Sequence, residues 1–250
     1  MFVPFWRSPQ RSAESPALGK MDIVHRLMDR FGYSRYLEIA TSTTGLYHHE
    51  IKRGRLAVCR RLLYNLPPDF SDGQPIDYAC AGLDISPALT AIAAEGVRFD
   101  IMLVDPYHGY EQSYRDIAEA FTMLEPGGAL VVHDCLPPDE SLARPEFTPG
   151  SWCGVTYKAY LDFVLGRADL RYLTVDTDYG CGVVRKVPVE VRAAPPSARW
   201  LRPRDRVQTW RRFGDDYAAA WRYFSRNTPS LLRLVGAADV LSGAAFHPLE

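Results

Sequence analysis

The stretch FDIMLVDPYHGYEQSYRD, residues 99–116, joins an apolar run directly to a group of ionisable side chains. The run IMLV shows no alternation of apolar and polar residues, so it predicts a strand covered on both faces, as in a parallel sheet. Asp105, Tyr107 and His108 follow it at once. Because ligands of open α/β sheets bind at the carboxyl ends of the strands, the stretch predicts a functional site at this strand end.

The same pattern recurs in ALVVHDC, residues 129–135, where a second apolar run ends in His133 and Asp134. Between the two runs, residues 114–124 place apolar side chains at helical spacing. A helix of this length returns the chain across the sheet in a right-handed strand-helix-strand unit. Both polar strand ends are therefore expected at one edge of the sheet.

The rest of the chain also alternates between strand and helix patterns. Further strands are predicted at 36–40, 55–59 and 76–80, and two within 170–187 joined by a turn at 176–180. Helices are predicted at 19–32, from 46 onward, and at 87–96, 152–165, 215–227 and 230–235. This order predicts a doubly wound α/β sheet that ends in a hairpin.

Composition suggests one main domain with appendages. Residues 1–18 are expected to form a flexible arm, 19–187 the sheet domain, 188–206 a proline-rich linker and 207–250 a helical extension. The apolar positions of the extension can dock on the domain or form a homodimer.

The charge and cysteine content narrow the function classes. The net charge is −1 over 250 residues, so neither nucleic acid nor an anionic membrane is an expected partner. No apolar run approaches the roughly 20 residues that span a bilayer. Five scattered cysteines without a C-x-x-C pair favour a reducing, cytoplasmic location. A small molecule is the expected partner.

Four motifs, in this order and spacing, resemble a known family: YLEIATSTTG, VDPYHGYE, EPGGALVVHDC and TVDTDYGCGVV. They resemble the class I S-adenosylmethionine (SAM)-dependent methyltransferases, particularly a small bacterial group with D-x-x-H-x-Y-E and G-G…H-D at strand ends. The resemblance covers about residues 20–187. It implies a Rossmann-like, seven-stranded, mostly parallel sheet with a terminal antiparallel hairpin, and methyl transfer from SAM to oxygen of a sugar or natural product.

The resemblance also implies where the cofactor binds. Its expected contacts are Glu38, Thr41, Ser42, Thr43, Gly45 and Asp105. Threonine and serine replace the glycines that usually let backbone amides approach SAM. The second strand is expected to end in Arg60 and Arg61, where the family has an acid for the ribose, so Asp69 or Asp72 is the expected substitute.

Arginine at that strand end suits a phosphate better than a ribose diol. The alternative function is therefore a nucleotide or nucleotide-sugar enzyme on the same fold. A third alternative is a degenerate, non-catalytic methyltransferase-like partner subunit.

Methyl transfer requires alignment of the acceptor and removal of its proton. His108 is the expected base, because imidazole titrates near neutral pH, or else a hydrogen-bond partner of the substrate, with Asp105 and His133 as further catalytic candidates. Asp105 and Asp134 can share a Mg²⁺ ion. Against the metal, two carboxylates are few ligands, and His133 is the neighbour of Asp134 on a strand, so their side chains are expected to start on opposite faces.

Aromatic side chains near these strand ends are the expected contacts of the acceptor. They are Tyr107, Tyr110, Trp152 and Tyr157. The alternative for Trp152 and Tyr157 is packing in the core.

Overall fold

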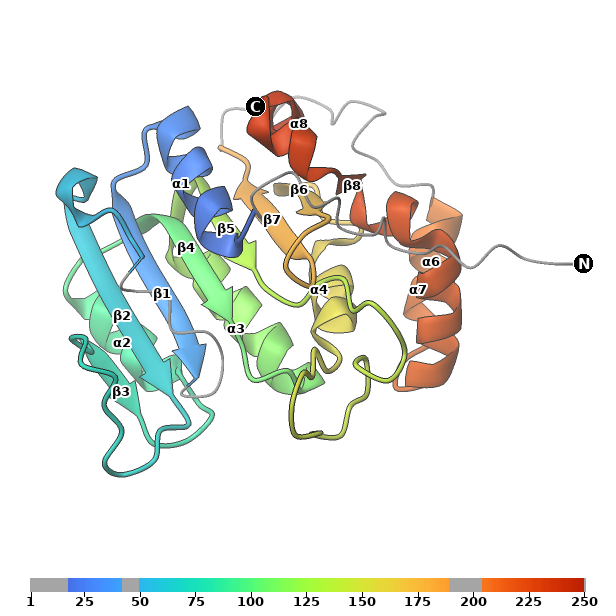
Figure 1. Cartoon of the computed structure of the whole chain (residues 1–250), viewed down its shortest axis with the longest axis horizontal. Helices are drawn as coiled ribbons and strands as arrows, with labels where there is room; N and C mark the ends of the chain where they lie inside the picture. The colour runs from blue at the N-terminus through green and yellow to red at the C-terminus, as the bar shows by residue number, and fades with distance from the viewer. Residues whose placement is uncertain (1–17, 42–49, 189–203, 250) are drawn as a thin grey trace, which may run out of the picture.

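The computed structural model describes residues 18–41, 50–188 and 204–249. An eight-stranded sheet with the order β3-β2-β1-β4-β5-β7-β6-β8 forms its centre (Figure 1). The strands are β1 Arg35–Thr41, β2 Val58–Tyr64, β3 Tyr78–Cys80, β4 Phe99–Asp105, β5 Leu124–Val132, β6 Leu170–Val175, β7 Cys181–Lys186 and β8 Leu234–Val235. Strands β1 to β5 are parallel, whereas β7 is antiparallel to both β5 and β6.

Helices cover both faces of the sheet. They are α1 Lys20–Phe31, α2 Ser86–Ala94, α3 Tyr110–Met123, α4 Thr156–Val164, α6 Arg204–Arg211, α7 Tyr217–Leu232 and α8 Ala237–Leu241, with 3₁₀ turns η1 Arg53–Arg55 and η2 Ala244–Leu249. One apolar core lies under α1, α8 and η2, and a second lies under α2, α3, α4, α6 and α7. The doubly wound fold predicted from the sequence is therefore confirmed.

The start of the chain shows why these residues fold locally as they do. Helix α1 buries Ile23, Val24 and Leu27 on one face, as their spacing predicts. It ends at Gly32, whose left-handed φ of 70° is adopted at no steric cost because glycine has no Cβ.

The unit β4-α3-β5 forms as predicted and positions the strand ends. Val104 pairs with Val132 in parallel register, and the backbone N–H of His133 donates to the Val104 carbonyl at 3.0 Å. On the other side, Ala40 of β1 pairs with Asp105 of β4. The carboxyl ends of β1, β4 and β5 consequently meet at one edge of the sheet.

The sheet has eight strands rather than seven. Residues 230–235 were expected to be helical, but α7 ends at Leu232 and Arg233 turns the chain with a φ of 50°. The remaining pair, Leu234–Val235, adds to β6 as β8. A short apolar run fits a helix or a strand equally well, so only the available edge of β6 decides its conformation.

The second strand also differs from its predicted range. Strand β2 runs over Val58–Tyr64, so Arg60 and Arg61 lie inside it and do not follow it. The prediction at 55–59 was wrong because two arginines looked like a strand end, although the apolar residues after them continue the strand. A helix was also predicted from residue 46 onward. Its first residues fall in the range 42–49, which lies outside the described residues, and residues 50–52 are not helical.

The C-terminal extension packs on the domain. Helix α6 begins at Arg204, within the range expected to be linker, and residues 189–203 lie outside the described ones. Helix α7 buries Phe224, Leu231 and Leu232 in the second core, so much of its apolar face is used within the chain. Homodimerisation remains a prediction. Among the described helices, none is long and apolar enough to cross a membrane.

Candidate functional site

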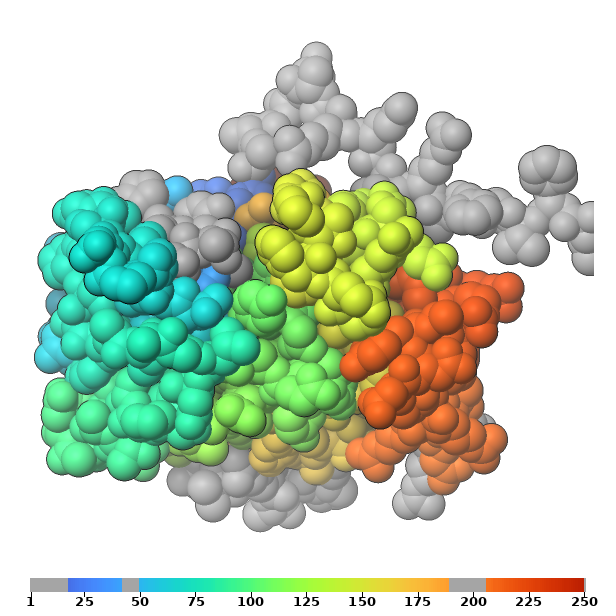
Figure 2. All heavy atoms as spheres, turned by 90° about the horizontal axis from the view of Figure 1, so that it is seen from below, coloured from blue at the N-terminus to red at the C-terminus, as the bar shows by residue number. Residues whose placement is uncertain are grey.

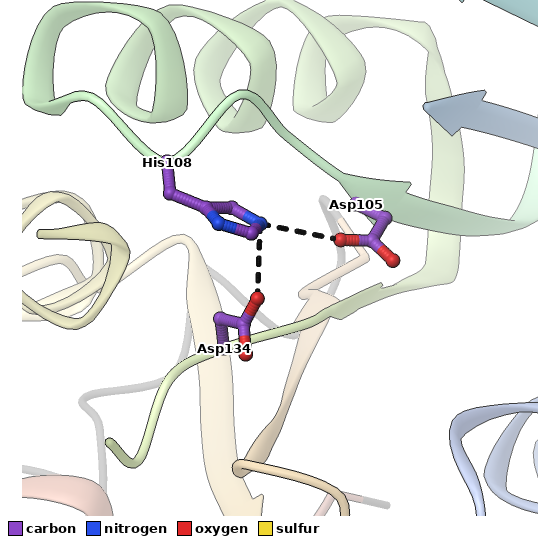
Figure 3. A group of neighbouring side chains, drawn as sticks. All are labelled: Asp105, His108 and Asp134. Carbon is purple, nitrogen blue, oxygen red and sulfur yellow. Dashed lines mark ion pairs between the residues drawn. The ribbon is translucent and has the colours of Figure 1, made fainter. Parts of the chain in front are cut away.

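Ionisable side chains gather where β4 and β5 end, and together they are called the ionisable cluster. Asp105 is the last residue of β4, His133 and Asp134 follow β5, and His108 lies in the loop between β4 and α3 (Figure 3). The full cluster is Lys20, Asp105, His108, His133, Asp134 and Asp178.

His108 points its imidazole at two carboxylates. Its Nδ1 donates a hydrogen bond to the Trp152 carbonyl at 2.5 Å, and its Nε2 lies 2.9 Å from Asp134 Oδ2 and 3.6 Å from Asp105 Oδ1 (Figure 3). Burial opposes protonation, but the two carboxylates raise the pKa of His108 to about 9. In the protein alone His108 is therefore an imidazolium at neutral pH, which is a poor base.

His133 lies among three carboxylates. Its Nδ1 is 3.4 Å from Asp105 Oδ1 and 3.3 Å from Asp134 Oδ2, while its Nε2 is 3.4 Å from Asp178 Oδ1. Burial opposes protonation here too, but Asp105 and Asp134 raise the pKa of His133 well above its usual range.

His133 and Asp134 face the same cluster although they are neighbours in the chain. Strand β5 ends at Val132, and Asp134 adopts a left-handed φ of 60°. The expectation that their side chains point to opposite faces was wrong, because the alternation of a strand stops where the strand stops.

Lys20 is a member of the cluster that the sequence did not reveal. Its Nζ lies 2.6 Å from Asp105 Oδ2, and the two side chains are 2% and 1% exposed. The pKa of Asp105 is well below its usual range: burial raises it, and the Lys20 charge is the largest of the effects that lower it. A lysine that begins a helix usually reads as a surface residue, so no local signal marks it.

Asp178 enters the cluster from the turn between β6 and β7. The turn was predicted, but the role of Asp178 was not. Asp178, Tyr179 and Gly180 have successive φ angles of 47°, 58° and 88°, all left-handed. Only glycine adopts this conformation readily, so the turn holds strained backbone. This conformation places the Asp178 carboxylate beside His133 and lets it accept from the Lys20 backbone N–H at 3.3 Å.

The segment before α4 fixes the position of His108. Trp152 supplies the carbonyl to Nδ1, and the Val155 N–H donates to the His108 carbonyl at 2.9 Å. Between them, Gly154 has a φ of 56°, and a Cβ there would lie 2.1 Å from the His108 carbonyl oxygen. On the face in Figure 2, the yellow loop before α4 lies against the green segment that leads into α3.

Gly154→Ala is expected to destabilise the fold and displace His108, because the added methyl group has no room. Gly150→Ala is the matched control, since Gly150 also has a left-handed φ of 98° but no atom within 4 Å of a built Cβ. The control should cost only the backbone strain of about 1 kcal/mol or more. Urea unfolding and the imidazole NMR shifts of His108 measure both effects. Equal losses in the two variants would contradict the role of Gly154.

The expected cofactor residues are only partly described. Glu38 lies buried in β1 and accepts a weak hydrogen bond from the Tyr36 hydroxyl at 3.5 Å. Thr41 is the buried last residue of β1. Ser42, Thr43 and Gly45 lie outside the described residues. Their contact with SAM remains a prediction.

Two of the expected acceptor residues lie next to His108. The Trp152 ring is 5.4 Å from the His108 ring and 5.6 Å from that of Tyr107. The Tyr110 hydroxyl instead donates to Asp162 at 2.7 Å. Tyr157 is fully buried against the aromatic rings of α6 and α7. It therefore packs in the core, which was the alternative to acceptor binding.

Arg61 of β2 is not available to bind a phosphate. Arg61 is fully buried, and both terminal nitrogens of its guanidinium donate to the two oxygens of Asp72. This pairing lowers the pKa of Asp72 to about 2. Asp72 is thus occupied by Arg61, and the residue that follows β2 is Asn65.

The cluster has donors of the kind that bind a divalent cation. Asp105, His108 and Asp134 each offer one ligand atom, and these atoms all lie within 4.8 Å of one another. The structure thus brings together the two predicted metal ligands and adds an imidazole. Carboxylate oxygen and neutral imidazole nitrogen are both common metal ligands, so the residues fit such an ion.

Comparison with known proteins gives only distant similarities. No family model matches the sequence, and no curated protein matches it significantly. Among solved structures, an O-methyltransferase from Bacillus cereus in complex with SAH is 12% identical, with a TM-score of 0.48 over 70% of this chain and 84% of that one.

Two further solved structures are similar. The O-methyltransferase TomG from Streptomyces achromogenes, involved in tomaymycin synthesis and solved with SAM, is 16% identical, with a TM-score of 0.48 over 67% and 78% of the two chains. The methyltransferase MycE of mycinamycin biosynthesis, solved with Mg, SAH and mycinamycin VI, is 17% identical, with a TM-score of 0.42 over 69% and 50%. Similarities of this size do not assign an activity to the chain.

Proposed function

We propose that this chain transfers a methyl group from SAM to a small molecule, with a hydroxyl oxygen of a sugar or natural product as the acceptor. The observation that carries this proposal is the position of the ionisable cluster at the carboxyl ends of β4 and β5. It lies beside the point where the direction of strand order reverses, which is where nucleoside cofactors bind in open α/β sheets.

The topology supports a cofactor next to the cluster. The chain proceeds outward from β1 through β2 to β3, then returns to β4 on the other side of β1. A cofactor over the end of β1 would contact the region of Thr41. Because Ala40 pairs with Asp105, its reactive end would lie near the cluster.

The chemistry requires a destination for one proton. The acceptor oxygen attacks the methyl carbon of SAM, a carbon–oxygen bond forms, and the carbon–sulfur bond breaks to leave S-adenosylhomocysteine (SAH). The hydroxyl proton must leave, to a carboxylate of Asp105 or Asp134 or to solvent, and the imidazolium of His108 is placed to stabilise the alkoxide. A divalent cation bound there would lower the pKa of the acceptor hydroxyl.

The surroundings of His108 suit a small acceptor. The Trp152 ring is 8% exposed and packs against His108, whereas the Tyr107 ring is partly exposed and is the one on which a sugar or aromatic ring can stack. The nucleotide-binding alternative depended on Arg60 and Arg61 at a strand end, but both lie inside β2, and Arg61 is paired with Asp72.

Calorimetric titration of the full chain with SAM and SAH tests the proposal. Saturable binding is expected, with a dissociation constant in the range of about 1 μM to 1 mM that is typical of enzyme substrates. UDP-glucose and ATP are the control ligands, because the alternative function predicts that they bind instead. No heat of binding with SAM or SAH at millimolar concentration would contradict the proposal.

A further inference from the structure

The two histidines of the ionisable cluster face the same pair of carboxylate oxygens. His108 Nε2 lies 2.9 Å from Asp134 Oδ2 and 3.6 Å from Asp105 Oδ1. His133 Nδ1 lies 3.3 and 3.4 Å from the same two oxygens. These four atoms, called the two-histidine, two-aspartate set, lie at the ends of β4 and β5, and three of them, from Asp105, His108 and Asp134, are all within 4.8 Å of one another.

The spacing of this set is that of ligands around a metal ion. Ligands about 2.1 Å from an ion lie about 3.0 Å apart at adjacent corners of an octahedron and about 3.4 Å apart in a tetrahedron. All four nitrogen–oxygen separations lie near these values. Both nitrogens are buried, and neither makes a hydrogen bond within the described part of the chain.

The second nitrogen of His108 makes a hydrogen bond, whereas that of His133 lies near a carboxylate without a hydrogen bond to any described residue. The second nitrogen of His108, Nδ1, donates to the Trp152 carbonyl, and the second nitrogen of His133, Nε2, faces Asp178 Oδ1 at 3.4 Å. Imidazoles that bind metals are usually held in this way, with the distal N–H directed at a carbonyl or carboxylate. The hydrogen bond orients the other nitrogen of His108 toward the set, and the nearby Asp178 carboxylate favours an N–H at Nε2 of His133, which leaves the lone pair on Nδ1.

The net charge of the cluster and the contact of Asp105 with Lys20 also favour a bound cation. Lys20 occupies Oδ2 of Asp105, so Oδ1 alone faces the histidines and serves as a single ligand. When both imidazoles are neutral, the described residues of the cluster carry three carboxylate charges, from Asp105, Asp134 and Asp178, against the charge of Lys20. A divalent cation would balance them.

We propose that His108, His133, Asp105 and Asp134 form a metal site selective for a first-row transition-metal ion, such as Fe²⁺ or Zn²⁺, over Mg²⁺. Imidazole nitrogen suits these ions, whereas Mg²⁺ prefers oxygen ligands and retains its water. His108 then acts as a ligand and not as a base. The role of the ion, activation of the acceptor oxygen, rests on the proposed function, but the site itself does not.

Cobalt titration tests the site without any methyl transfer. The full chain is treated with a chelator and titrated with Co²⁺, whose visible absorption reports nitrogen ligation, and the titration is repeated in 10-fold and 1,000-fold excess of Mg²⁺. One Co²⁺ per chain is expected, with binding at least 100-fold tighter than that of Mg²⁺. Equal or preferential binding of Mg²⁺, or no Co²⁺ binding, would overturn the proposal.

Variants then identify the ligands. His133→Ala and His108→Ala are each expected to change the Co²⁺ spectrum and weaken binding at least 10-fold, and Asp178→Asn should weaken it by about 10–100-fold through His133. His247→Ala is the matched control, because His247 is exposed, does not belong to the ionisable cluster, and its ring contacts Arg30.

Circular dichroism shows whether each variant is folded. The competition between Co²⁺ and Mg²⁺ uses the wild-type chain, so its result does not depend on the folding of any variant. Unchanged Co²⁺ binding in folded His133→Ala would overturn the assignment. Because SAM is absent throughout, failure of SAM binding and failure of the metal site are separate results.

Discussion

Lys20→Met is expected to destabilise the protein by about 3 kcal/mol, toward the lower end of the 3–5 kcal/mol typical when one partner of a buried ion pair is removed. The Lys20 and Asp105 side chains are almost fully buried, so the variant leaves Asp105 in a low-dielectric site without its ammonium partner. His133, 3.4 Å from Asp105, compensates in part, which is why the lower end is expected. Urea denaturation at pH 7 measures the loss.

Two comparisons separate the loss of the buried ion pair from the general effect of replacing a lysine by methionine. Lys52→Met is the matched control on an exposed lysine and should change stability by less than about 0.5 kcal/mol. The double variant Lys20→Met/Asp105→Asn should be more stable than the sum of its single changes predicts, because it removes the charge that Lys20→Met leaves alone. A loss in Lys20→Met no greater than in Lys52→Met would show that the buried pair contributes nothing.

His108→Ala is expected to lower turnover by about 10²–10⁴-fold, the range for loss of a group that assists proton removal, which His108 does here as a ligand of the proposed ion. The affinity for SAM and the unfolding midpoint should change little, because His108 lies in a loop beyond the end of β4 and its ring is partly exposed. Turnover is measured as SAH released with the best acceptor found in a panel of hydroxylated sugars and phenols.

His247→Ala again serves as the control and should keep full turnover. If His108→Ala retained turnover within twofold of the wild type, the reaction would not take place at the ionisable cluster. Loss of SAM affinity in His108→Ala without loss of stability would instead assign His108 to cofactor binding.

Local patterns were sufficient to predict much of the fold. The apolar run of β4, the helical periodicity of α3 and the second run of β5 each depend on neighbouring residues, and this unit formed as expected. The hairpin of β6 and β7 with its turn at 176–180 also follows from local sequence. Strand β8 could not be predicted, since two apolar residues become a strand only because β6 offers an open edge.

The site was predictable only where its residues follow strands. Asp105, His108, His133 and Asp134 were identified for that reason. Lys20 and Asp105 are 85 positions apart, and Lys20 and Asp178 are 158 positions apart. No sequence pattern links residues at such separations, so contacts of this kind come from packing of α1 and the β6–β7 turn alone.

These separations have a consequence for the order in which the cluster is completed during synthesis. Lys20 leaves the ribosome early, whereas Asp178 emerges only after most of the sheet has been made. Since the Lys20 backbone N–H and His133 both contact Asp178, a nascent chain that stops before the β6–β7 turn holds Lys20, Asp105 and His133 without their last partner. The hairpin that ends the sheet is therefore also the step that closes the site.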